Sequence, residues 1–143
     1  MKIGELALAA QCTVETVRYY EREGLLAAPA RTSANYRSYG ASHLERLRFI
    51  RNCRALDMAH DEIRALLVLA EQPASDCHGV NHLLDEHIAH VNTRIAELTQ
   101  LKSQLDELRR RCQHEQPVEA CGILKGLALM EPETRKEKHT HLG

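Results

Sequence analysis

The sequence has few aromatic side chains: no Trp, one Phe and four Tyr among 143 residues. All five aromatic residues lie within the first 49 positions, so the rest of the chain must pack through Leu, Ile, Val and Ala. This uneven distribution indicates two differently built regions, a small head with its own core and a long helical tail.

The sequence also lacks an apolar run of about 18 residues and a leader with a charged start and an apolar core, so we expect a cytoplasmic protein with no membrane partner. Five cysteines, an odd number, are expected in that reducing compartment to be free or metal-bound. The lack of a CxxC motif argues against a thioredoxin-like enzyme, and no set of Ser, His and Asp or pair of carboxylates points to catalysis.

The charge is divided unevenly along the chain. Residues 1–56 hold nine Lys or Arg and five Asp or Glu, a net charge of +4, whereas residues 57–143 hold ten and fifteen, a net charge of −5. A polyanion such as nucleic acid would bind the basic part, although this charge alone does not establish it.

The start of the chain predicts a helix pair. "IGELALAA" has apolar residues at helical spacing, the pattern then breaks, and Thr13 is a good N-cap for a second helix that ends at Gly24. Such a pair is the form of a helix-turn-helix. The residues that its second helix would expose toward a major groove are Glu15, Thr16, Arg18, Tyr19 and Arg22. An ordinary solvated helix face is the alternative.

Residues 29–40 predict a short hairpin, because Pro, Ser, Asn and Gly punctuate a segment that contains Arg31, Tyr36 and Arg37. Arg and Tyr at the tip of a hairpin would hold a phosphate backbone beside the second helix, as a wing does. A polar loop without a binding role is the alternative.

Two more helices complete the expected head: one that starts at a capping box, Ser42–Glu45, and buries Cys53, and one over "HDEIRALLVLAEQ". Together, "IGELA", "VETVRYYEREGLL", "NYRSY" and "LRFIRNCRALDMAHDEIRALL" resemble the N-terminal domain of the MerR family of metal- and drug-responsive transcription regulators. The resemblance runs in order over about residues 2–69 and is specific. It implies a winged helix-turn-helix that binds double-stranded promoter DNA.

The resemblance also implies roles for single residues. The implied DNA-binding residues are Thr13, Thr16, Arg18, Tyr19, Arg31, Tyr36, Arg37 and Arg54. The first four belong to the helix that reads the major groove, the next three to the wing that holds the backbone, and the last is a candidate phosphate contact on the following helix.

From Val80 to Leu108 the apolar residues recur at steps of 4, 4, 3, 4, 3, 3, 4 and 3, which is a coiled-coil stripe with one stammer. A narrow stripe on so long a helix has too little partner surface within this small chain. We therefore expect the same helix of a second chain to cover it in a homodimer.

Cys77 and Cys112 extend this stripe at its two ends, 35 residues or about 52 Å apart along one helix. An antiparallel coiled coil would bring Cys77 of one subunit beside Cys112 of the other, and residues 113–120 would return Cys121 to the same point. We expect two such three-cysteine metal sites, with Arg109–Arg111 lowering the thiol pKa values. For each cysteine alone, a buried small residue or a surface thiol is the alternative.

"DCHGVNHLLDEHI", "ELRRRC" and "EACGIL" extend the resemblance, up to Leu124, to the lead- and cadmium-responsive branch of the family. It implies Pb(II) or Cd(II) as the effector, with Zn(II) or Hg(II) as alternatives, and the nine-residue step from Cys112 to Cys121 is closer to the lead regulators. It also implies repression without metal and, with metal, distortion of an overlong promoter spacer so that RNA polymerase engages both promoter elements.

Histidines offer a second site with harder ligands. His87 and His90 lie one helical turn apart, and His139 and His141 close the chain, which resembles cadmium regulators with His-rich ends. His114, inside the thiol loop, would be a fourth ligand of the cysteine site. Solvated histidines on a helix face and in a tail are the alternative.

The expected architecture is mainly α. It comprises a winged helix-turn-helix over 1–72, a linker and dimerisation helix over 73–111 that forms an antiparallel coiled coil, a metal-binding loop over 112–124 and a flexible tail over 125–143. The expected function is a metal-responsive regulator of a resistance or efflux operon, and not an enzyme. The alternatives are a cytoplasmic protein that buffers metal through the same thiols without DNA, and a thiol redox switch.

Overall fold

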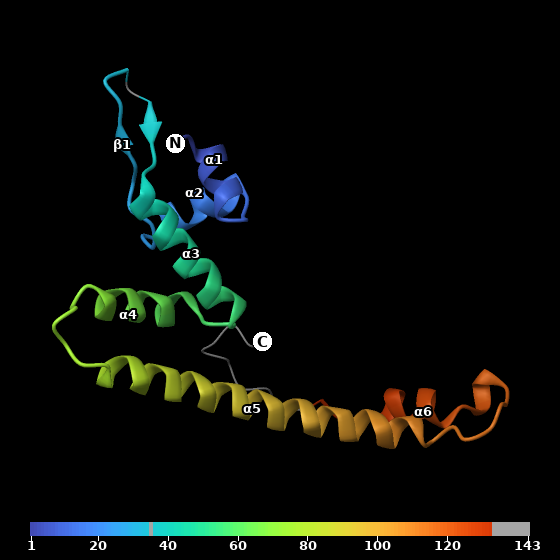
Figure 1. Cartoon of the computed structure of the whole chain (residues 1–143). Helices are drawn as coiled ribbons and strands as arrows, with labels where there is room; N and C mark the ends of the chain where they lie inside the picture. The colour runs from blue at the N-terminus through green and yellow to red at the C-terminus, as the bar shows by residue number, and fades with distance from the viewer. Residues whose placement is uncertain (35, 133–143) are drawn as a thin grey trace. The chain divides into compact units, whose positions relative to one another are not determined.

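The computed structural model describes residues 1–34 and 36–132 and is mainly helical, as predicted (Figure 1). Its elements are α1 (Ile3–Ala9), α2 (Val14–Arg22), β1 (Ala30–Arg31), β2 (Arg37–Ser38), α3 (Ala41–Ala55), α4 (His60–Ala70), α5 (His78–Arg109), the short 3₁₀ helix η1 (Val118–Ala120) and α6 (Gly122–Leu129). They form two compact units, Met1–Val80 and Asn81–Gly143, and the expected functional boundaries at residues 72, 111 and 124 stay predictions. None of the described helices combines the length and the apolar composition needed to cross a membrane.

The helix pair at the start of the first unit is a helix-turn-helix. After α1, Gln11 takes a left-handed φ of 58°, and Thr13 caps α2 by accepting a hydrogen bond from the Thr16 N–H at 3.1 Å. A Thr hydroxyl can satisfy one of the N–H groups that the first turn of a helix leaves without a helical partner. The predicted break and restart of the helix are thus confirmed.

One aliphatic core holds the first unit together. Its fully buried large side chains come from α1, α2, the turn after α2, α3 and α4; they are Leu6, Val17, Leu25, Leu47, Ile50 and Ile63. Cys53 lies at the edge of this core with 7% exposure, and burial raises the pKa of its thiol. A buried thiol of this kind is inert, so Cys53 is a packing residue, as predicted.

The predicted hairpin is a two-stranded antiparallel ribbon. Its register pairs Ala30 with Ser38 and Arg31 with Arg37. Tyr39, directly after β2, is buried and donates a hydrogen bond to the Glu21 carboxylate on α2, and Arg37 Nη1 lies 3.6 Å from the same carboxylate. Burial and the Glu21 carboxylate raise the pKa of Tyr39 to about 12, so its hydroxyl stays protonated at neutral pH and keeps the wing attached to α2.

The predicted capping box at Ser42–Glu45 is wrong. α3 begins two residues earlier, with Gly40 as its N-cap, and the Gly40 N–H donates to His43 Nδ1 at 3.1 Å. The His43 imidazole therefore takes the part that a Glu side chain usually plays three residues into a helix. After α3, Asp57 takes a left-handed φ of 60° and turns the chain into α4, where the predicted break lies.

α5 runs without a break from His78 to Arg109, 32 residues or about 48 Å (Figure 1). The apolar stripe predicted along it is largely exposed. Its exposed members, with 38 to 57% of their surface accessible, are Ile88, Ile95, Leu98, Leu101 and Leu105. A continuous apolar surface of this length is typical of an association surface.

α6 packs against the C-terminal end of α5 through two glycines one helical turn apart. A Cβ at Gly122 would meet the Arg111 carbonyl oxygen at 2.5 Å, and one at Gly126 would meet the Arg111 guanidinium, with Leu108 Cδ1 at 3.2 Å. The missing side chains therefore let the two helices approach closely. α6 runs from Gly122 to Leu129 and so includes residues of both the predicted metal-binding loop, 112–124, and the predicted tail, 125–143.

We expect Gly122→Ala to loosen α6, because the new Cβ would lie 2.5 Å from the backbone carbonyl oxygen of Arg111, in the turn directly after α5, and backbone cannot swing aside as the end of a side chain can. Gly126→Ala is the matched control, since the end of the flexible Arg111 side chain can swing aside and Ala favours a helix by up to about 1 kcal/mol over Gly. Hydrogen–deuterium exchange of the α6 amides should be faster in Gly122→Ala and unchanged or slower in Gly126→Ala. Equal exchange in the wild type and both variants would contradict this packing.

Candidate DNA-binding surface and candidate thiolate metal site

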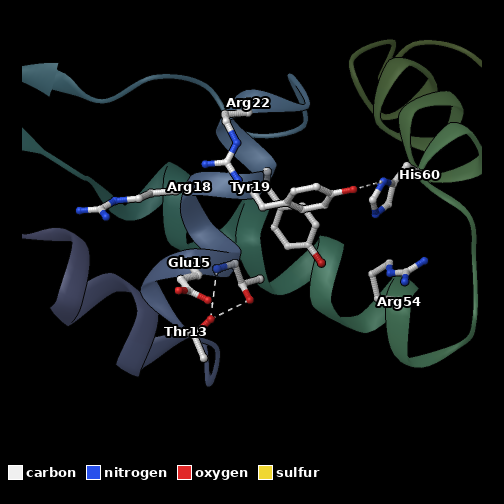
Figure 2. A pocket seen from close by; sticks show the side chains of 9 residues that line it. Thr13, Glu15, Arg18, Tyr19, Arg22, Arg54 and His60 are labelled. Carbon is white, nitrogen blue, oxygen red and sulfur yellow. Dashed lines mark hydrogen bonds between the residues drawn. The ribbon is translucent and has the colours of Figure 1, made fainter.

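A hollow on the first unit is lined mainly by α2, with contributions from α3 and α4 (Figure 2). Its lining residues are Thr13, Glu15, Thr16, Arg18, Tyr19, Tyr20, Arg22, Arg54 and His60. Five of the residues predicted to bind DNA are among them. Arg54 reaches this surface from the end of α3, where one of its N–H groups also donates to the Met58 carbonyl oxygen at 2.9 Å.

A second hollow joins α2 to the wing. Its lining residues are Lys2, Ile3, Arg18, Glu21, Arg22, Tyr36 and Arg37. Arg18 borders both hollows, and Arg31 lies opposite Arg37 on the paired strand. Seven of the eight residues predicted to bind DNA therefore line one surface, which runs from the wing across α2 to the end of α3. Their individual contacts with DNA stay predictions.

This surface is basic. Its guanidinium groups come from Arg18, Arg22, Arg37 and Arg54. Two carboxylates, those of Glu15 and Glu21, also border it, and Glu21 already accepts a hydrogen bond from Tyr39 and pairs with Arg37. Guanidinium and hydroxyl donors suit the phosphate oxygens of a duplex, whereas the base edges are read by side chains of a helix inserted in the major groove.

His60, the first residue of α4, is a member of this surface that sequence reasoning missed. Its Nδ1 lies 3.4 Å from the Tyr19 hydroxyl oxygen, and the centres of the two rings are 5.4 Å apart. Forty-one residues separate the pair, and no spacing pattern relates the start of one helix to the face of another.

The structure brings Cys112 and Cys121 together at the junction of α5 and α6. The intervening loop is closed by Gln116, whose Nε2 donates to the Ala120 carbonyl oxygen at 3.2 Å and to Cys112 Sγ at 3.8 Å. The Cys112 side chain lies close enough to Cys121 to lower the pKa of the Cys121 thiol, and a polar loop links the two residues.

Backbone amides hold the pKa of the Cys121 thiol below its ordinary value. The main causes are the backbone amides of Leu124 and Ile123, in the first turn of α6, and the Cys112 side chain lowers the pKa of Cys121 further. Hydrogen bonds to the charged form favour the thiolate, which is the species that binds metal.

The arginines predicted to lower this pKa do not cause the shift. Arg109 donates instead to the Cys112 carbonyl oxygen at 2.8 Å, and the Arg111 guanidinium pairs with Glu107 at 4.0 Å. The first turn of α6 replaces them as the source of positive potential at Cys121.

Cys77 lies exposed just before α5, so about 48 Å of helix separates it along the chain from Cys112. No third Cys, His, Asp or Glu in the described part of the chain completes a three-ligand group with Cys112 and Cys121. A three-cysteine site therefore requires a second copy of the chain. The assignment of Cys77, Cys112 and Cys121 as metal ligands stays a prediction.

A second, histidine-containing metal site stays a prediction. His87 and His90 lie one turn apart on α5, with ring centres 6.5 Å apart. The His114 carbonyl oxygen accepts a hydrogen bond from the Cys112 thiol at 3.6 Å, and nothing tests its imidazole as a ligand. His139 and His141 lie outside the described residues.

Known proteins similar to this chain are transcription regulators. The family model described as "MerR HTH family regulatory protein" matches residues 1–68, and the one described as "MerR, DNA binding" matches residues 44–108. The "HTH-type transcriptional regulator ZntR homolog" of Haemophilus influenzae is 51% identical over 78% of this chain and 82% of its own length.

Two solved structures extend the similarity to the fold. The transcription regulator PbrR691 from Ralstonia metallidurans CH34, in complex with lead(II), is 52% identical, with a TM-score of 0.80 over 89% of this chain and 98% of its own. A MerR protein from Bacillus megaterium MB1, in complex with mercury(II), is 28% identical, with a TM-score of 0.66 over 90% and 99%. The chain therefore belongs to the MerR family of helix-turn-helix transcription regulators and is not an enzyme.

Proposed function

We propose that this chain is a metal-responsive regulator that binds promoter DNA as a homodimer in the cytoplasm. On binding Pb(II), or alternatively Cd(II), it activates a heavy-metal resistance or efflux operon. Cys112 and Cys121 of one subunit and Cys77 of the partner subunit hold the ion. The observation that carries the proposal is that Cys112 and Cys121 lie close together at one end of α5, with Cys77 at the other.

The sulfur atoms suit a soft effector. Thiolates select soft and borderline cations over Mg, Ca or Mn, and the amide-stabilised thiolate of Cys121 is prepared for such an ion. The lead(II) complex of a 52% identical regulator supports Pb(II) as the first choice. The similarity to a ZntR homologue and to a mercury(II)-bound regulator keeps Zn(II) and Hg(II) as alternatives.

The antiparallel dimer follows from the stripe on α5. A second copy of α5 running in the opposite direction covers the exposed side chains from Ile88 to Leu105. The same arrangement sets Cys77 of the partner subunit beside Cys112, and two-fold symmetry repeats the site. A parallel pair would leave the two kinds of cysteine at opposite ends.

Activation couples this site to DNA shape. The two heads bind the half-sites of a pseudo-palindromic promoter, and closure of the 112–121 loop shifts each partner head, which is connected to Cys77 through α4. The resulting bend and untwist of the promoter spacer let RNA polymerase engage both promoter elements. Such a deformation costs a few kcal/mol, which a site of several thiolates can supply.

Arg37→Ala, alone or with Tyr36→Phe, should weaken DNA binding, because it removes an exposed wing guanidinium from each head. The slope of log K against log salt concentration should fall by about 0.9 for each lost phosphate contact. Electrophoretic retardation of a duplex that the wild type selects from a random pool measures both effects. Lys102→Ala, an exposed change on α5, is the control and should bind normally. Wild-type protein that retards no duplex at all would instead support the metal-buffering alternative.

Cys77→Ser, Cys112→Ser and Cys121→Ser should each lower Pb(II) affinity by at least about tenfold, because each removes one sulfur ligand. Titration of reduced protein, followed by thiolate-to-metal absorption, measures this, and the same series with Cd(II), Zn(II) and Hg(II) ranks the ions. Affinity should also fall as the pH falls, since the thiols must lose their protons. Cys12→Ser, a change in the first unit at a thiol whose pKa burial raises, is the control and should bind as the wild type does. The ligand assignment fails if all three variants bind like the wild type.

A further inference from the structure

Two contacts with the same spacing join α2 to α4. The Tyr19 hydroxyl lies 3.4 Å from His60 Nδ1, and Arg64 Nη2 donates to the Glu23 carbonyl oxygen at 2.7 Å and pairs with the Glu23 carboxylate at 3.2 Å. Each contact spans 41 residues of sequence. The partners are four residues apart on both sides, so each helix contributes one face. The two contacts therefore lie one helical turn apart and join α2, the helix predicted to face DNA, to α4.

Neighbouring residues hold the His60 side chain in place. The turn before it is closed by the Arg54 side chain on the Met58 carbonyl oxygen, and Met58 itself is buried. The His60 and Tyr20 rings pack in a T-shaped arrangement, with ring centres 6.1 Å apart and planes at 82°. Arg64, one turn further along α4, fixes the same face of that helix to the end of α2.

The Tyr19 side chain, in contrast, is partly exposed, so a contact that fixes its orientation matters. Its surface is 38% exposed, and it lies in the hollow that contains most of the predicted DNA contacts. Figure 2 shows its hydroxyl aimed at His60, and the Arg22 guanidinium carbon lies 6.0 Å from its ring centre. A side chain that is already fixed before binding loses less entropy in the complex, and so binds more tightly.

We propose that His60 is a positioning residue, which orients Tyr19 for its contact with DNA and so lets α4 set how the α2 surface meets the duplex. The inference rests on the proposed function, because it requires Tyr19 to contact DNA. It adds a residue that lies outside the helix-turn-helix and the wing. His60 acts through the Tyr19 hydroxyl, and not as an independent phosphate contact.

A double-mutant cycle on the full-length protein tests this role. Tyr19→Phe and His60→Ala should each weaken binding of the selected duplex by roughly threefold to tenfold per head, and the double variant should bind no more weakly than Tyr19→Phe. If the two losses multiply, His60 either contacts DNA independently or only supports the fold, and the positioning role is overturned. A general folding defect would appear in both backgrounds, so it cannot imitate the expected result.

A conservative variant sharpens the test. In His60→Asn the side-chain amide places a polar atom two bonds from Cβ, as Nδ1 is in His, so binding should recover relative to His60→Ala when Tyr19 is present and not in Tyr19→Phe. His82→Ala, which removes an exposed imidazole on α5, should have no effect on DNA affinity. If Arg37→Ala and Tyr19→Phe both leave binding unchanged, the proposed DNA surface is itself wrong. If they weaken binding and His60→Ala does not, only the positioning role fails.

Discussion

The apolar stripe of α5 is largely exposed among the described residues, and the rest of the account depends on our proposal that a second chain buries it. The chain has no aromatic residue after position 49 from which a second core could be built, and α5 carries Leu and Ile residues that are 38 to 57% exposed. Burial of apolar surface contributes about 25 cal/mol for each Å², so a partner helix stabilises this region substantially. If that partner runs antiparallel, Cys77 at one end of the stripe lies beside Cys112 and Cys121 at the other end of the partner's stripe. Each metal site then takes ligands from both chains.

The first unit holds its DNA-facing helix from two sides. On the wing side, Glu21 of α2 accepts from Tyr39 and pairs with Arg37; on the α4 side, Tyr19 contacts His60 and Glu23 contacts Arg64. These contacts on both sides favour a single orientation of α2 within the first unit. A metal signal would then reach the promoter as a movement of whole heads. The duplex would deform in response, by bending and untwisting.

Local signals in the sequence were sufficient for most of the fold. Thr13 caps α2 because a hydroxyl at that position satisfies a free N–H, and the break after α1 follows from the loss of apolar spacing. The start of α3 was misplaced, because an imidazole, that of His43, caps the Gly40 N–H where the usual pattern has Glu. The stripe on α5 and the length of that helix followed directly from residue spacing and the rise per residue.

The candidate sites were predictable only in part. The proximity of Cys112 and Cys121 was expected from the length of the loop between them. The amides that favour the Cys121 thiolate depend on where α6 starts, and the position of α6 depends on the close approach at Gly122. The Tyr19 to His60 contact depends on how two helices cross. Such contacts arise from tertiary packing, which residue spacing in one segment does not encode.

The central claim is that each metal site takes ligands from two chains, and mixed dimers test it most directly. A dimer of one Cys77→Ser chain and one Cys112→Ser chain, prepared with two different affinity tags, keeps one complete set of Cys112, Cys121 and the partner's Cys77. It should bind about one Pb(II) with wild-type affinity, about half the capacity of the wild-type dimer, whereas neither homodimeric variant should retain a tight site. Loss of every tight site in the mixed dimer would contradict the account, because it would place all the ligands of each site within a single chain.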